Sequence, residues 1–145
     1  MRVEFQKSSL LLVALLLLCL FVQFGWQRGI AASLAAFFSL ACHELGHVAA
    51  AIVEGVKVKA IGLCLKGSYI IREQSPEPLE EAIIASGGLG FNFVLAILAW
   101  PYWRWLGLLN LVLLVSNALP FEGSDGQRLL ACLRKWRDAA LNGQA

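Results

Sequence analysis

Residues 9–26 contain no charged side chain, and three further apolar runs follow at 29–53, 82–100 and 103–119. A helix rises about 1.5 Å per residue, so each run can cross most of a hydrocarbon core about 30 Å thick. A soluble domain distributes its apolar residues around one core and does not gather them in a series of long runs. The sequence therefore predicts an all-α membrane protein with about four transmembrane helices.

The composition agrees with a membrane protein and excludes other classes. Of the 145 residues, 59% are hydrophobic and 15% are charged, whereas soluble domains carry about 25% charged residues. The net charge is only +2, and no basic tract contains interleaved aromatic residues, so nucleic acid is not an expected partner. Arg2 and Lys7 precede the first run, as in a signal peptide, but the run is long for one and three more follow it.

Two segments interrupt the helical pattern. Residues 56–72, between the second and third runs, alternate apolar and polar side chains and contain a Gly-Ser turn, which predicts a small β-hairpin. An open sheet cannot span lipid, so we expect this hairpin at the interface or in solvent. The fourth helix is expected to break near Pro120, and residues 126–145 follow as a short amphipathic, basic tail. Residues 1–145 are thus expected to form one integral-membrane domain.

Basic residues are distributed unevenly around the predicted spans. They precede the first span, lie between the second and third, or follow the fourth, with the exceptions of Arg28 and Arg104. Lys and Arg gather on the cytoplasmic side of short membrane-protein loops. The sequence therefore predicts a multi-pass protein of the cell membrane with both termini and the hairpin in the cytoplasm.

The only two histidines, His43 and His47, flank Glu44 in a His-Glu-Leu-Gly-His sequence within the second run. Residues four apart lie on one helix face, so both imidazoles can bind one metal ion. Glu44 projects to the side, where it can act as the general base, a role that this spacing supports in zinc peptidases. Placing an ionisable group inside a span costs about 2.5–3.5 kcal/mol of insertion free energy. A metal site would compensate that cost, whereas a chance arrangement of the three residues would not. We therefore expect a metal site.

A catalytic zinc ion takes a third protein ligand and keeps one position open. No other histidine exists, so a carboxylate after the Pro120 break is the best candidate, because the chain can turn back there. Asp125 and Glu122 are both possible ligands, and Asp125 is favoured because Gly126 frees the backbone beside it. Cys42, next to the histidine motif, is a third alternative.

Asn92 and Asn117 are amides inside the third and fourth apolar runs. Such amides commonly form hydrogen bonds between helices. The alternative is a direct contact with substrate or with a developing oxyanion. Their position alone leaves both interpretations open.

Together these motifs resemble the site-2 protease family of intramembrane zinc metalloproteases. The resemblance rests on residues 43–47 in one span and, about 80 residues later, on Asn117-Ala118-Leu119-Pro120 and Asp125-Gly126. Residues 88–92, Gly-Leu-Gly-Phe-Asn, look like the family's GPxxN element. The early position of the histidine motif is similar to the compact, sporulation-type branch. The resemblance covers most of the chain, from the second span to Gly126.

Three residues depart from the family pattern. Leu89 and Ala118 stand where prolines are usual, and Ser124 stands where leucine is usual before the aspartate. None of these departures removes a metal ligand or the base. They leave the shape of the break in the fourth span open.

The resemblance implies a Zn²⁺ cofactor and specific roles: His43, His47 and Asp125 as metal ligands, Glu44 as catalytic base, and Asn92 and Asn117 near the substrate. The hairpin would correspond to the family's membrane-associated sheet, whose edge can pair with an extended substrate strand. The expected function is cleavage within or next to a transmembrane segment of a membrane-bound regulator, such as a pro-sigma or anti-sigma factor. The alternative is a non-catalytic metal-binding membrane protein that acts as a partner subunit or chaperone. A transporter or channel is disfavoured, because the first and third spans offer few polar residues.

Overall fold

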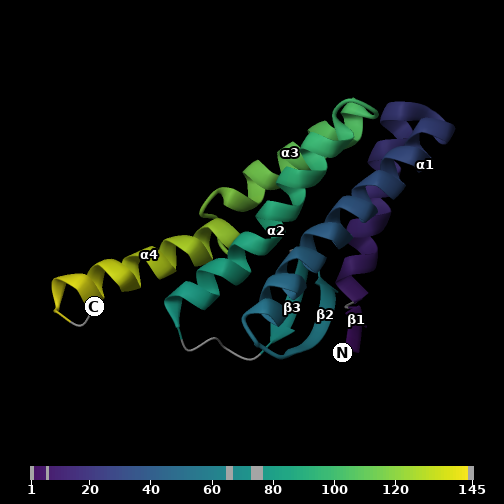
Figure 1. Ribbon diagram of the computed structural model, residues 1–145. Helices are drawn as coiled ribbons and strands as arrows, with labels where there is room; N and C mark the ends of the chain where they lie inside the picture. The colour runs from purple at the N-terminus through teal and green to yellow at the C-terminus, as the bar shows by residue number, and fades with distance from the viewer. Residues whose placement is uncertain (1, 6, 65–66, 73–76, 144–145) are drawn as a thin grey trace.

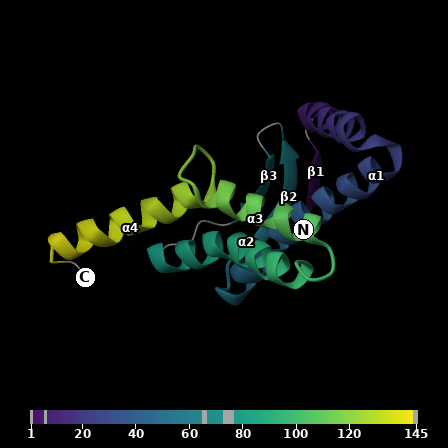
Figure 2. The ribbon, with the colours of Figure 1, turned by 90° about the horizontal axis from the view of Figure 1, so that it is seen from above.

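The computed structural model describes residues 2–5, 7–64, 67–72 and 77–143. Within these residues lie three short strands and four helices: β1 (Arg2–Phe5), α1 (Lys7–Val53), β2 (Val58–Cys64), β3 (Gly67–Arg72), α2 (Pro78–Ala99), α3 (Arg104–Ala118) and α4 (Asp125–Leu141). Figure 1 shows the strands near one end of α1, and α4 extending away from the other helices. The same separation of α4 is visible from above (Figure 2). The chain is mostly helical, as predicted.

Helix α1 consists of two arms that meet at Gly25. The φ of Gly25 is 72°, in the left-handed region that favours glycine. The arms, residues 7–24 and 26–53, return toward the same end of the molecule (Figure 1). This return brings β1, which precedes the first arm, into parallel pairing with β2, which follows the second. The break between the predicted spans 9–26 and 29–53 thus lies at Gly25, where glycine permits the reversal, and Arg28 lies within the second arm.

The three strands form one sheet in the order β1-β2-β3. β2 and β3 pair antiparallel, from Val58 opposite Arg72 to Cys64 opposite Gly67. They occupy the segment for which a hairpin was predicted, and the tip at 65–66 lies outside the described residues. The sequence pattern does not predict β1. Among the described strands, β1 and β3 each have only one neighbour, so both are edge strands.

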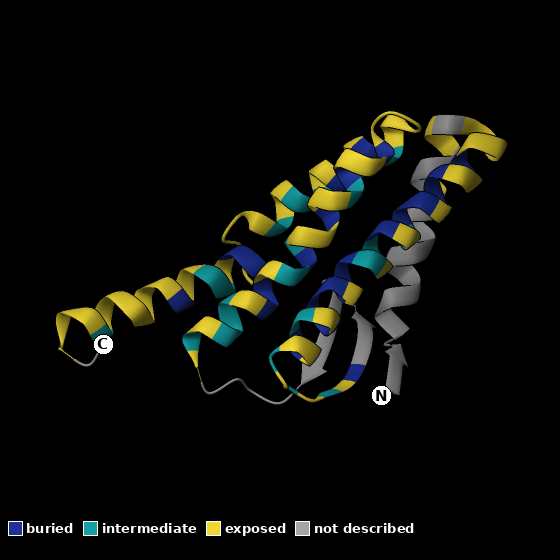
Figure 3. Cartoon of the chain, viewed as in Figure 1, coloured by how far each residue is buried: buried dark blue, intermediate teal, exposed yellow. Residues whose placement is uncertain are grey.

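Small side chains fill the interior of the bundle and large ones cover its outside. On α2, Phe93, Val94, Ile97 and Leu98 are all more than half exposed. The buried residues include a series of alanines: Ala32, Ala35, Ala36, Ala51, Ala85, Ala96 and Ala99. Figure 3 shows buried stripes along α1 and α2 and exposed residues on their outer faces. Soluble proteins bury their large apolar side chains, so this arrangement fits helices that pack through small residues within lipid.

Two helices within the described residues are long and apolar enough to cross a membrane: the second arm of α1, and α2. They correspond to the predicted spans 29–53 and 82–100. Helix α3 is apolar but shorter, so the count of four spans stays a prediction. Helix α2 begins earlier than predicted, at Pro78, because proline is tolerated in the first helical turn. Glu80 and Glu81 in that turn favour the same start through the helix dipole.

Candidate metal centre

The histidine motif lies in the second arm of α1, where His43, Glu44 and His47 are all buried. Helical spacing places the two imidazole rings 4.7 Å apart, edge to face. The arm can approach α2 closely because Gly46 faces Gly87. A side chain on either glycine would collide with the main chain of the other helix. This close contact encloses the two histidines between the helices.

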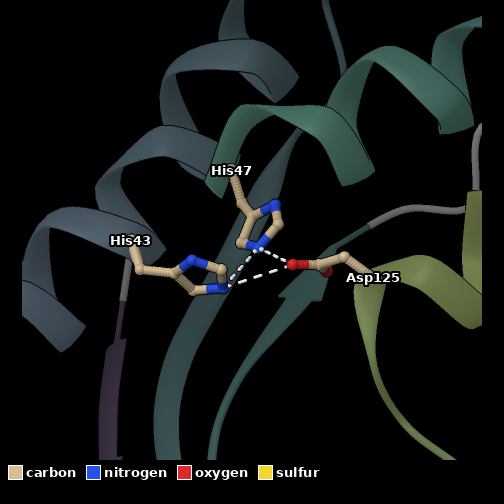
Figure 4. Close-up of side chains that lie close together, drawn as sticks. All are labelled: His43, His47 and Asp125. Carbon is tan, nitrogen blue, oxygen red and sulfur yellow. Dashed lines mark hydrogen bonds and ion pairs between the residues drawn. The ribbon is translucent and has the colours of Figure 1, made fainter. Parts of the chain in front are cut away.

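Asp125, the first residue of α4, completes a group of three side chains that could hold a metal ion (Figure 4). Its Oδ2 lies 3.3 Å from Nε2 of His43 and 3.2 Å from Nε2 of His47. The two Nε2 atoms lie 3.2 Å apart. In a tetrahedral zinc site with ligands at about 2.0–2.1 Å, neighbouring ligand atoms are about 3.3–3.4 Å apart. The triangle therefore has the size that one zinc ion requires.

The hydrogen-bond partners of His47 indicate a neutral ring that suits a cation at this place. Its Nδ1 lies 2.7 Å from the carbonyl oxygen of Ile84, which can only accept, so Nδ1 carries the proton of the neutral ring. The N–H of Gly88 approaches the same nitrogen at 3.4 Å, too far to outweigh that bond. Nε2 then presents a lone pair. Among the described residues no hydrogen-bond donor reaches Oδ2 of Asp125. Facing lone pairs repel one another without a cation between them, so these residues fit zinc.

Asp125 has the charge that a metal ligand needs. Burial opposes ionisation of its carboxyl, but His43 and then His47, when their rings carry a proton toward it in place of a metal ion, outweigh burial and lower the pKa of Asp125 from 3.8 to about 2. The N-terminal end of a helix also favours negative charge. Asp125 is therefore a carboxylate at neutral pH, the form that binds metals.

A cap on α4 holds Asp125 in place. The hydroxyl of Ser124 accepts the N–H of Gln127 at 3.2 Å and donates toward the carbonyl oxygen of Leu119 at 2.6 Å. In return, the side chain of Gln127 accepts the N–H of Gly123 at 2.8 Å. This reciprocal bonding is close to that of a capping box, which a leucine could not form. The departure from the family pattern at Ser124 thus fixes the turn that presents Asp125.

Gly126 serves a different purpose from the one expected. Its φ is not in the left-handed region, and it lies within α4. A side chain there would collide with the carbonyl group of Ala118 at the end of α3 and lie 2.9 Å from the carbonyl carbon of Leu119. The expectation that Gly126 acts through backbone freedom is therefore wrong. Gly126 instead gives α4 the room to start beside α3.

The remaining candidate residues lie in different places. Asn92 is fully buried, and its Nδ2 lies 3.1 Å from Nδ1 of His43. Asn117 is half-buried and donates to a main-chain carbonyl of its own helix at 3.0 Å. Glu122 is exposed and Cys42 is half-buried, and neither belongs to the metal-binding group. The metal-binding group thus contains the favoured carboxylate, Asp125, and neither alternative ligand.

Sequence reasoning missed one buried polar contact near the centre. Asn110 of α3 and Ser39 of α1 are both fully buried, and Nδ2 of Asn110 donates to Oγ of Ser39 at 2.9 Å. Ser39 lies one helical turn before His43. An amide within an apolar run was the available signal, since such groups need a partner in lipid. The contact ties α3 to the arm that carries the histidines.

Comparisons with known proteins identify the family of this chain. The profile of peptidase family M50 matches residues 31–103, half of the chain. A Synechocystis protein provisionally named a zinc metalloprotease is 30% identical over 119 residues, which cover 72% of this chain and 31% of that protein. The solved site-2 protease from Methanocaldococcus jannaschii is 26% identical with a TM-score of 0.76, over 92% of this chain and 67% of that one. The chain thus spans less than a third of the curated relative.

The family profile includes the histidine motif and all of α2, the helix that packs against it. The solved structure extends the likeness over nearly the whole chain. Because sequence profile, fold and ligand geometry agree, the chain belongs to peptidase family M50, the zinc metalloproteases that include the site-2 proteases.

Proposed function

We propose that this chain is an intramembrane zinc endopeptidase that cleaves a peptide bond within or next to a transmembrane segment of another protein. The observation that carries the proposal is the triangle of ligand atoms from His43, His47 and Asp125, with Glu44 buried on the same helix. A zinc ion bound there supplies a Lewis acid that polarises a peptide carbonyl and makes water more acidic. Both properties are what hydrolysis of an unactivated amide needs.

The residues of the chain would divide the remaining work. His43, His47 and Asp125 would hold the metal at a fixed place between α1, α2 and α4. Glu44 would take a proton from the attacking water as the oxygen of that water bonds to the carbonyl carbon. It would return that proton to the leaving amine nitrogen as the C–N bond breaks. By family resemblance, Asn92 and Asn117 would lie near the substrate.

We propose access from the cytoplasmic side of a multi-pass protein. His43 is ten residues before the end of α1 at Val53, or roughly 15 Å along the helix, so water must reach it through protein. A groove of about 540 Å³ opens between the end of α1 and β2, and its lining includes Val48 and Lys57. Arg28, the predicted outside residue of α1, lines a separate cavity together with two tryptophans of the α2–α3 connection and α3. The assignment of both termini and the sheet to the cytoplasmic side rests on the distribution of Lys and Arg along the sequence.

The sheet suggests how a substrate helix is opened. A helical segment must unwind before its carbonyl can reach a metal, and unwinding leaves backbone groups unpaired in lipid. The edge strands β1 and β3 could pair with the unwound segment. We propose membrane-bound regulators, such as a pro-sigma or anti-sigma factor, as the substrate class. This choice of substrate class follows from the family resemblance.

The test is the variant Glu44→Gln, with Glu122→Gln as an exposed control. Both proteins would be reconstituted with a fluorescent substrate that contains a transmembrane segment. We expect Glu44→Gln to keep one zinc per chain and lose cleavage, because it retains the shape but not the base. Glu122→Gln should keep both. Wild-type cleavage by Glu44→Gln would remove the mechanism, and zinc without turnover in the wild type would favour the non-catalytic partner.

A further inference from the structure

The amide of Asn92 contacts the metal ligand His43 on the side away from the metal. Asn92 comes from α2 and is 0% exposed. Its Nδ2 lies 3.1 Å from Nδ1 of His43. Its Oδ1 is also buried, and no donor among the described residues bonds to it. One half of this amide therefore has no hydrogen-bond partner among the described residues.

The chemistry of His43 decides which half of the amide faces it. Nε2 of His43 points at Oδ2 of Asp125 and at Nε2 of His47, so Nε2 is the metal-binding atom. A neutral imidazole has one proton, which must then be on Nδ1. An N–H facing an amide NH₂ would place two donors together. Turning the amide of Asn92 by 180° exchanges nitrogen and oxygen, so that Oδ1 accepts the proton of Nδ1. The same turn satisfies the orphan oxygen.

His47 provides an independent parallel on the same helix pair. Its Nδ1 lies 2.7 Å from the carbonyl oxygen of Ile84, also on α2. Each ligand histidine of α1 therefore has its outer nitrogen against a group of α2: a main-chain carbonyl for His47 and a side-chain amide for His43. Metal-binding histidines usually donate their second N–H in this way, which fixes the tautomer and the ring orientation.

We propose that Asn92 is a positioning residue of the metal centre, whose side-chain carbonyl accepts the Nδ1–H of His43 and so points Nε2 at the metal. The proposal rests on the metal-binding role of His43, His47 and Asp125 given above. This positioning role and a contact with substrate use different halves of the Asn92 amide. A substrate carbonyl or oxyanion would need the NH₂ group as donor, whereas His43 needs the oxygen as acceptor.

Two variants separate these uses. Asn92→Asp keeps an acceptor and removes the donor, whereas Asn92→Leu keeps the volume and removes both. Zinc affinity of the full chain in detergent would be measured by competition with a chelator, without substrate. We expect Asn92→Leu to weaken zinc binding by about 10- to 100-fold, the usual effect of losing such a partner. Asn92→Asp should restore most of that loss. Asn110→Leu, which removes a fully buried amide of α3 that contacts Ser39, should leave zinc affinity unchanged.

The outcomes are distinguishable. Wild-type zinc affinity in Asn92→Leu, or a loss in Asn92→Asp as large as in Asn92→Leu, would overturn the positioning role. An equal loss in Asn110→Leu would also overturn it, because the effect would then be general loosening. If Asn92→Leu does not fold, Asn92→Ala supplies the same comparison with Asn92→Asp. Absence of zinc from the folded wild type would instead refute the proposed function and this role with it.

Discussion

Replacing Gly88 by alanine would place a methyl group inside the metal centre. The new Cβ would lie 2.6 Å from Cε1 of His43 and 2.7 Å from Cε1 of His47, whereas carbon atoms in contact are about 3.5–4.0 Å apart. The rings or α2 must then shift by about 0.8–0.9 Å to reach even the shorter distance. Ligand distances in a metal site tolerate about 0.2 Å. We therefore expect Gly88→Ala to lose stoichiometric zinc and about 1–3 kcal/mol of stability, the usual cost of overpacking.

Gly90→Ala is the matched control, because Gly90 lies on the same helix as Gly88 and a Cβ there meets nothing within 4 Å. Zinc content of the detergent-purified proteins would be measured by elemental analysis, and stability by thermal unfolding. The control should keep one zinc per chain. If Gly88→Ala also kept one zinc per chain at wild-type affinity, the close packing of α2 against the two rings would be refuted.

Three further predictions concern the support of Asp125 and the metal itself. Ser124→Ala should lower the free energy of unfolding by about 1 kcal/mol, measured by thermal unfolding, because the helix cap is lost. Ser124→Thr should retain most of the stability that the cap provides. Gly126→Ala should lose zinc in elemental analysis because its Cβ meets the carbonyl of Ala118, and a full zinc content would contradict that contact. Removing zinc with a chelator should lower the Tm, since zinc at about 100 times its Kd contributes about 2.7 kcal/mol. Asp125→Ala should show no such shift, and an identical shift in that variant would argue against Asp125 as a ligand.

The local part of the site could be predicted from the sequence. Four-residue spacing on a helix places His43 and His47 on one face wherever the helix lies. The choice of Asp125 over Glu122 needed more, because both follow the Pro120 break. The structure brings only Asp125 within ligand distance of the histidines, since it starts α4 while Glu122 stays exposed in the preceding turn.

The non-local parts could not be predicted in this way. Strand β1 is four residues long and pairs with residues 60–63 only because α1 reverses at Gly25. The packing of Gly88 against the histidines, and the open space around Gly90, depend on how α2 crosses α1. Spacing within one element carries no information on such crossings. The cap by Ser124 was within reach, because serine followed three residues later by glutamine is a helix-start signal.

Metal content of the detergent-purified protein tests the central claim most directly, with wild type, Asp125→Ala and Glu122→Ala measured side by side by elemental analysis. We predict about one zinc per chain in the wild type and in Glu122→Ala, as expected for a single site with two histidines and one aspartate. We predict loss of that zinc in Asp125→Ala. Folded wild type without bound metal, or Asp125→Ala with its zinc intact, would contradict the site described here.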